Sequence, residues 1–143
     1  MTGLELAADC SRCAGLCCVL LPFRSVDGFG GDKSGGEACD NLADDNLCRI
    51  HDRLEESGWS GCVRYDCQGA GQHVTQVTYA GRDWRSGEVN LAEMAAVFSV
   101  MRVLHGRLAE LDPSSEAFAA TAALTTGSAE DLLGLDLSEL PGV

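Results

Sequence analysis

The chain has 143 residues, which is enough for one domain with a modest hydrophobic core. Hydrophobic residues make up 45% of the chain, an ordinary share for a globular protein that excludes extensive disorder. The net charge of −12 repels nucleic-acid phosphates and anionic lipid surfaces, so we expect no nucleic acid and no membrane among its partners.

Residues 1–9 lack the basic and apolar regions of a secretory signal peptide. The longest nearly apolar stretch, residues 94–104, is interrupted by Ser99 and Arg102 and is too short to span a bilayer. We therefore expect a cytoplasmic protein, in a compartment that keeps thiols reduced.

The first half of the chain shows little regular pattern. Residues 27–36 contain five glycines, which predicts a flexible loop. Ile50 and Leu54 stand at helical spacing and predict a short helix over residues 49–57, with Gly58 as its stop.

A segment rich in Val, Thr and Tyr follows the last cysteine, at residues 73–79. Glycines bound it on both sides, at Gly71 and Gly81. This composition predicts a strand, which could form half of a short β-hairpin.

A long amphipathic helix gives the clearest signal in the chain. Asn90 and Glu93 form a capping pair directly ahead of an apolar run. Apolar residues then recur at steps of three and four, which is the spacing of one helix face. They are Leu91, Met94, Ala95, Phe98, Met101, Leu104, Leu108 and Leu111.

Two shorter helical elements are predicted to follow. Asp112 and Pro113 are expected to end the long helix and to begin a second one, because proline suits the first helical position. The second helix is predicted to end near Gly127. Ser128 and Asp131 then cap a last short turn.

These elements together predict a small, mostly α fold with a single domain over residues 1–143. Its parts are a cysteine-rich metal-binding lobe over residues 1–72, a short strand or turn over residues 73–87, and a helical part over residues 88–143. We expect the C-terminal helices to pack across the irregular lobe and to supply a hydrophobic backing that loops cannot build.

Eight cysteines lie between residues 10 and 67, and none follows. An even number is typical of a disulfide scaffold, but a cytoplasmic location argues against that interpretation. So many free cysteines in a short segment would also be unusual if they served only as small hydrophobic residues. A metal centre is therefore the favoured interpretation. The cysteines are Cys10, Cys13, Cys17, Cys18, Cys39, Cys48, Cys62 and Cys67.

Soft thiolates favour zinc and iron–sulfur clusters. The two-residue spacing of Cys10 and Cys13 lets both sulfurs turn toward one centre, and Cys17 adds a third from the same loop. Its neighbour Cys18 is expected to point elsewhere and is the first candidate for a structural cysteine. Zinc sites usually pair two such knuckles, whereas the later spacings here are irregular, which favours an iron–sulfur cluster over zinc. Eight thiols could also fill two separate four-ligand sites.

Small residues follow the last cysteine. Gly69, Ala70 and Gly71 lack the Lys-Ser/Thr pair that completes a phosphate-binding loop. We expect them to let the backbone pass close to the cysteine cage after Cys67.

The remaining candidate residues carry weaker signals. His51 lies three residues after Cys48 and could ligate a metal or donate a hydrogen bond to a thiolate, although eight cysteines already suffice as ligands. His73 is expected in the core or at the surface, and His105 at a solvated position of the long helix. Trp84 is expected to pack on the helices from a turn, with contact to another protein as the alternative.

The cysteine spacing resembles a known family. The residues that carry the resemblance are the runs CSRCAGLCC, ACDNL, LCRIH and GCVRYDC. They are similar to the zinc- or iron-chelating family known for its CxxCxxCC signature and its eight cysteines. The first run departs from that signature by one extra residue before Cys17 and Cys18. The resemblance covers residues 10–67 and implies a metal site.

A closer likeness extends beyond the cysteines. Six runs resemble the N-terminal region of actinobacterial pentapeptide-repeat proteins. They are CCVLLPF, CDNL, CRIHDRL, GCVRYDCQGAGQ, VTQVTYAGRDW and FSVMRVLHGRL. The wider family also resembles the cysteine-rich part of flagellin lysine N-methylases, where an iron–sulfur cluster is implied. By analogy, this likeness favours iron–sulfur for the present chain.

We therefore expect a metal-binding protein that holds an iron–sulfur cluster through cysteine thiolates, with a structural, redox or sensing role. A zinc-binding structural or interaction module is one alternative, and a cluster-dependent enzyme subunit is another. An enzymatic role is the less favoured, because no catalytic arrangement of Ser, His, Asp or Cys stands out.

Overall fold

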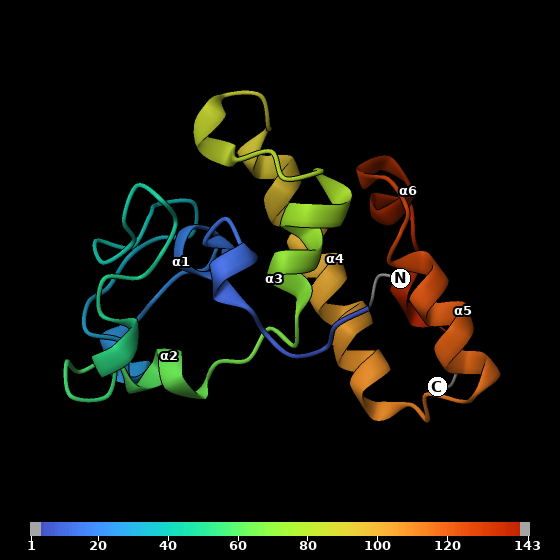
Figure 1. Ribbon diagram of the computed structural model, residues 1–143, viewed down its shortest axis with the longest axis horizontal. Coiled ribbons are helices and arrows are strands. Elements are labelled where there is room, and N and C mark those ends of the chain that lie inside the picture. The colour runs from blue at the N-terminus through green and yellow to red at the C-terminus, as the bar shows by residue number, and fades with distance from the viewer. Residues whose placement is uncertain (1–3, 141–143) are drawn as a thin grey trace.

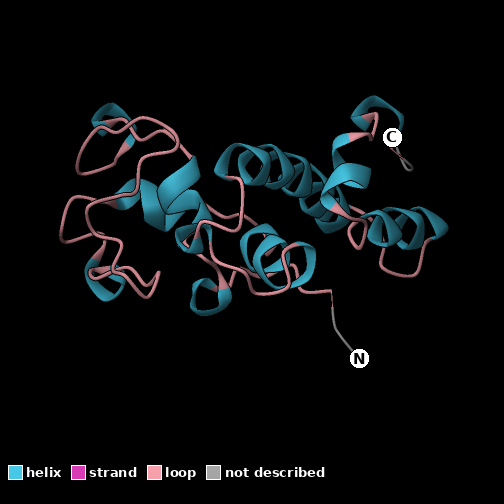
Figure 2. Ribbon diagram, turned by 90° about the horizontal axis from the view of Figure 1, so that it is seen from above, coloured by secondary structure: helices cyan, strands magenta, loops and turns pink. Residues whose placement is uncertain are grey.

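The computed structural model describes residues 4–140, so the predicted domain limits at 1 and 143 lie outside the described residues. The predicted small, mostly α fold is confirmed. An irregular lobe forms one end of the molecule, and α5 and α6 lie at the other end with α4 between them (Figure 1). Figure 2 shows the same division from above, with the loops gathered in the lobe.

Six α-helices are present within residues 4–140. They are α1 (Leu16–Leu20), α2 (Ser60–Arg64), α3 (Ala70–His73), α4 (Leu91–Glu110), α5 (Glu116–Leu124) and α6 (Ala129–Leu133). Shorter helical turns connect them. These are the 3-10 helices Cys10–Arg12, Ser25–Asp27, His51–Arg53, Trp84–Ser86 and Leu137–Glu139, and the π-helix Val74–Thr78.

The long helix α4 forms as predicted and organises the core. The Asn90 side chain accepts a hydrogen bond from the Glu93 backbone N–H at 3.0 Å and so caps the first turn. Its buried residues recur at steps of three and four and pack against α1, α3, α5 and α6. They are Met94, Val97, Phe98, Met101, Leu104, His105 and Leu108.

Two hydrophobic clusters of unequal size stabilise the chain. The main core joins α1, α3, α4 and α6 and contains fifteen buried residues, with Leu16 and Phe98 among the largest. The second cluster lies in the irregular lobe and has three buried residues, Phe23, Cys39 and Leu42. Much of the lobe's order must therefore come from sources other than apolar burial.

Aromatic rings hold the glycine-rich loop of the lobe. Phe29, from the predicted flexible segment, stacks on Phe23 with ring centroids 4.4 Å apart, and Trp59 packs edge-on against both rings. Isolated bridges pair Phe23 with Lys33 and Leu42 with Cys48. These two bridges are the only β-type pairing within the described residues.

The predicted strand over residues 73–79 is wrong, because this segment completes α3 and then forms the π-helix. Tyr79 donates its backbone N–H to the Val74 carbonyl at 3.0 Å, the five-residue step of a π-turn. Val74 and Tyr79 are buried in the main core, whereas Val77 is exposed. Packing against α4 therefore overrides the β preference of these side chains.

Two predicted helix boundaries also differ from the structure. Pro113 does not begin α5, because Ser115 caps that helix by accepting a hydrogen bond from the Phe118 N–H at 3.1 Å. The predicted helix over residues 49–57 is reduced to a 3-10 turn followed by irregular turns. That turn ends at Arg53, so Gly58 is not the end of a helix, although it has the left-handed φ of +88° that such an end would use.

The last predicted turn is confirmed. Ser128 and Asp131 form a complete capping box at the start of α6.

Within residues 4–140, no helix combines the length and the apolar character needed to cross a bilayer.

Candidate metal centre

The cysteines gather around one cavity between the lobe and the first helices. The cavity has a volume of about 130 Å³, and seven of the eight cysteines line it. These seven are Cys10, Cys13, Cys17, Cys18, Cys48, Cys62 and Cys67. Cys39 does not line it and is buried in the small cluster with Phe23 and Leu42.

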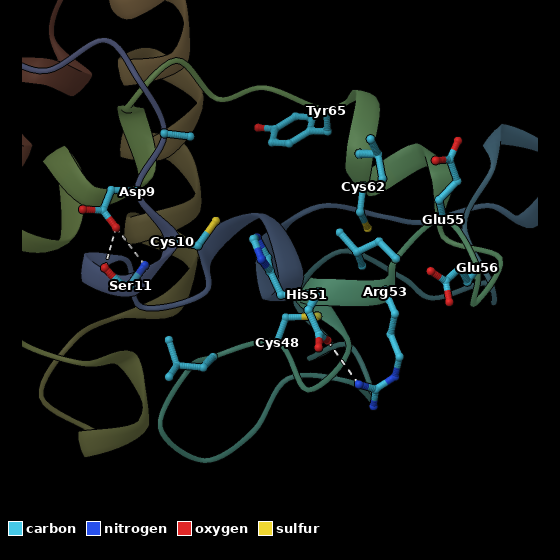
Figure 3. A pocket seen from close by; sticks show the side chains of 15 residues that line it. Asp9, Cys10, Ser11, Cys48, His51, Arg53, Glu55, Glu56, Cys62 and Tyr65 are labelled. Atoms are coloured by element: carbon cyan, nitrogen blue, oxygen red, sulfur yellow. Dashed lines mark hydrogen bonds and ion pairs between the residues drawn. The ribbon is translucent and has the colours of Figure 1, made fainter.

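The cavity shares a wall with an open hollow of about 1020 Å³. Cys10, Cys48, Cys62 and Tyr65 belong to both spaces. Figure 3 shows these side chains around the hollow, with His51 between the three cysteines. Solvent therefore has access to one side of the cysteine cage.

The first cysteines are fixed by hydrogen bonds to α3 and the π-helix. The Gln72 side chain accepts from the Asp9 N–H at 3.1 Å and donates to the Ala7 carbonyl at 2.8 Å. Thr75 Oγ1 accepts from the Ala14 N–H at 3.0 Å, and Gln76 donates to the Arg12 carbonyl at 2.8 Å. Segments more than 60 residues apart are thus joined on both sides of Cys10 and Cys13.

A glycine turn then aims the adjacent cysteine pair. Gly15 has φ of +71°, and a Cβ at this position would lie 2.8 Å from the Leu42 side chain. The α1 helix begins after this turn and carries Cys17 and Cys18. Their sulfurs lie 3.9 Å apart at the same cavity, contrary to the expectation that Cys18 points elsewhere.

The small residues after Cys67 let α3 approach the sulfurs, as predicted. A Cβ at Gly71 would lie 2.8 Å from Cys13 Sγ and 3.7 Å from Cys67 Sγ. Only glycine therefore fits at this point of α3 without displacing Cys13.

Backbone N–H groups point at several sulfurs. Leu16 donates to Cys13 Sγ and Asn41 donates to Cys39 Sγ, each at 3.4 Å. The Ile50 N–H also lowers the pKa of Cys48, against the larger effect of burial, which raises it. Such bonds stabilise a thiolate and help to set the potential of iron–sulfur centres.

The contact with Cys17 lowers the pKa of Cys18, whereas burial favours the protonated form of most of the other thiols. Burial raises the pKa of Cys13 to about 11 and that of Cys62 to about 12, from an ordinary value of 9.0. The shared contact with Cys18, together with burial, raises the pKa of Cys17 well above that value. A bound cation would therefore have to displace protons from the cage, which makes metal affinity rise with pH.

Two cations and one phenol complete the surroundings, and the sequence analysis did not single them out. Burial lowers the pKa of Lys33, and Cys39 and Cys18 nearby oppose this effect when they are ionised. On the other side, burial raises the pKa of Tyr65, the nearby thiolates of Cys17 and Cys67 add to this effect, and Arg102 opposes it.

The Tyr65 hydroxyl and Arg102 Nε are both buried with no hydrogen-bond partner of normal geometry within residues 4–140. Tyr65 lines the cavity, and the run GCVRYDC places it two residues before Cys67. Its position close to Cys67 in the sequence was the signal that could have identified Tyr65, since side chains next to a ligand often reach the same site.

The other predicted candidates fall in different places. His51 lines the cavity from its exposed turn. His105 is wholly buried in α4, so its predicted solvated position is wrong, and His73 packs edge-on against it. Trp84 packs between the two hydrophobic clusters as expected and donates its Nε1–H to the Ala14 carbonyl at 2.7 Å.

All eight cysteines are free thiols. Within the described part of the chain, no group of three or more His, Cys, Asp or Glu side chains is arranged to hold a single metal ion. The sulfurs thus surround a cavity instead of meeting at one point.

Comparison with known proteins shows similarity to the uncharacterized protein YybG of Bacillus subtilis (strain 168). The two sequences are 47% identical over 104 residues, which is 73% of this chain. The match covers 37% of YybG, so the chain spans little more than a third of that relative's length. No family model and no solved structure matches the chain.

Proposed function

We propose that this protein binds an iron–sulfur cluster through cysteine thiolates. The observation that carries the proposal is the cavity lined by seven cysteines. Thiolates are the ligands of such clusters, and four of them satisfy one cluster. The cavity of about 130 Å³ exceeds the space that one water molecule requires, so the sulfurs enclose room for a larger group.

Three further features support the fit of a cluster. Backbone N–H groups already point at the sulfurs of Cys13 and Cys39. Gly71 leaves room beside the sulfurs of Cys13 and Cys67, and a side chain there would clash with that of Cys13. Tyr65 presents a buried hydroxyl without a partner at the cavity wall, and a bound sulfide or thiolate would accept its hydrogen bond.

The first role that we propose for the metal is to stabilise the fold of the lobe. The lobe has only three buried residues in its own hydrophobic cluster, so metal binding would contribute directly to its folding. A cytoplasmic location, which keeps the thiols reduced, belongs to the same proposal. So does membership of the CxxCxxCC family, which is supported by the eight cysteines and their spacing.

A cluster-dependent enzyme subunit is the second candidate function. The open hollow beside Cys10, Cys48 and Cys62 favours it, because a small molecule could reach the cluster there. A cluster that binds an added ligand through this face would change its electron paramagnetic resonance spectrum. An unchanged spectrum with a range of small anions and thiols would contradict this second candidate.

Anaerobic purification tests the main proposal. The protein is expected to be coloured and to contain iron and acid-labile sulfide in equal amounts. Gly71→Ala should lower both severalfold, because the new Cβ displaces Cys13 Sγ. Gly31→Ala is the matched control, because a Cβ there meets nothing within 4 Å.

Two results would contradict the proposal. A colourless protein with stoichiometric zinc and no sulfide would show that the cysteines bind zinc and not a cluster. A protein that contains no metal, and whose thiols are already oxidised in fresh extract, would show that there is no metal centre.

A further inference from the structure

The hydrophobic surroundings divide the cysteines into two groups. Cys13, Cys17 and Cys67 pack against the main core, on the side of α3 and α4. Cys18 and Cys39 belong instead to the small cluster of the lobe. These five cysteines therefore pack against two different hydrophobic clusters, three on the helix side and two on the lobe side.

Backbone hydrogen bonds tie the lobe-side cysteines together. Cys39 donates its N–H to the Cys18 carbonyl at 2.9 Å, and Leu42 donates to the Cys39 carbonyl at 2.9 Å. Leu42 is in turn bridged to Cys48. Cys62 joins them through Trp59, whose carbonyl accepts the Cys62 N–H at 3.0 Å and whose ring packs on the same cluster.

The helix-side cysteines are tied together separately. Cys13 donates its N–H to the Cys10 carbonyl at 3.3 Å. Cys13 and Cys67 both touch the position where a Cβ of Gly71 would lie. Cys17 follows in α1 and packs against the same main core as Cys13 and Cys67.

Each group also has its own cation and its own N–H donor. Arg102 lies on the helix side, in α4, with its guanidinium over the Phe98 ring. Lys33, the single lysine of the chain, lies on the lobe side, with its ammonium over the Phe23 ring. Leu16 donates to a helix-side sulfur and Asn41 to a lobe-side sulfur. A tetrathiolate centre carries excess negative charge, which one nearby cation partly offsets.

From this division we infer that the chain holds two four-thiolate centres side by side and not one. The helix-side centre uses Cys10, Cys13, Cys17 and Cys67, and the lobe-side centre uses Cys18, Cys39, Cys48 and Cys62. The adjacent residues Cys17 and Cys18, with sulfurs 3.9 Å apart, place one ligand in each centre. This inference rests on the proposed metal-binding function and assigns every cysteine to a site.

The test uses one variant for each centre in the full chain, reconstituted anaerobically with iron and sulfide. Cys10→Ser and Cys48→Ser suit it, because both residues face the open hollow and contribute little to the cores. Each variant should retain about half of the wild-type iron, and the double variant almost none. Circular dichroism checks that α4 and α5 remain folded in all three.

Electron paramagnetic resonance of the reduced protein gives a second readout. Two centres this close should couple magnetically, so the wild type should show a broadened signal that sharpens in either single variant. Cys13→Ser and Cys39→Ser provide an independent pair, and each should behave like the variant of its own group.

Three outcomes distinguish the claims. If either single variant loses all of the wild-type iron, or if one of them loses none, a single centre is present and the inference of two is overturned. If the wild type binds two zinc ions, one lost in each variant, two centres stand and the iron–sulfur assignment fails. If the wild type binds no metal, the proposed function fails and the inference falls with it.

Discussion

At the scale of single residues, His105 shows how burial decides chemistry. It lies four residues after Met101 and three before Leu108, in the buried face of α4, and it is 0% exposed. Its Nδ1 bonds to the Gln68 carbonyl at 2.8 Å, and its Nε2 has no partner within the described residues. Burial therefore lowers the pKa of His105 from 6.5 to about 4, with smaller effects from Gln68 and His73.

This shift predicts acid sensitivity. Because the folded-state pKa lies below the unfolded one, the unfolded chain binds more protons between pH 6.5 and 4, and stability is lost as the pH falls through that range. Once the pH is below the folded-state pKa, protonation of His105 in the unfolded chain lowers the free energy of unfolding by about 3 kcal/mol. His105→Gln should flatten the dependence of the unfolding free energy on pH in this window. Val103→Gln, at an exposed position of the same helix, should keep the wild-type slope.

At the scale of elements, α3 and the π-helix act as a clamp on the first cysteine loop. Thr75 accepts a hydrogen bond from the Ala14 N–H at 3.0 Å and donates one to the Gly71 carbonyl at 2.9 Å. Thr78, one turn further, has a buried hydroxyl without a partner in the described residues. The same residue type thus stands in a bonded and an unbonded position of one element.

Thr75→Val and Thr78→Val form a matched pair. Thr75→Val leaves the buried Ala14 N–H without a hydrogen-bond acceptor. The free energy of unfolding should fall by about 1–3 kcal/mol, because nothing then offsets the removal of this N–H from water. Thr78→Val replaces an unpaired hydroxyl with a methyl group and should be neutral or stabilising. Chemical denaturation of both variants measures the difference. Equal destabilisation by the two would show that Thr75 does not clamp the loop.

At the scale of the whole molecule, stability is divided unequally between the two ends. The main core of fifteen buried residues can hold α1, α3, α4 and α6 by apolar burial. The lobe, with three buried residues, relies on aromatic stacking, turns and the proposed metal. Loss of the metal should therefore affect the two ends differently.

Hydrogen exchange after metal removal checks this expectation. Chelation under reducing conditions should remove amide protection over residues 21–64, while α4 keeps most of its protection. The reason is that α4 packs in the main core, which the sulfurs border without filling. Uniform loss of protection over both ends would mean that the lobe and the core unfold as one unit.

The amino-acid sequence by itself determined the features that depend on neighbours along the chain. The steps of three and four from Leu91 to Leu108 specify α4, and local hydrogen bonds at Asn90 and Ser128 fix two helix starts. The count and spacing of the cysteines likewise specify a cysteine-rich lobe. Such patterns are readable because all of the interacting groups lie within one or two helical turns.

Only the tertiary structure decided the features that depend on distant segments. Burial against α4 converted the predicted strand at residues 73–79 into a π-helix, and it placed His105 in the core. Folding of the lobe onto α1 brought Cys48 and Cys62 to the same cavity as Cys17 and Cys18, and it buried Cys39 in the small cluster. Spacing along the chain does not encode these contacts, because loop closure can bring many different pairs of cysteines together at similar entropic cost.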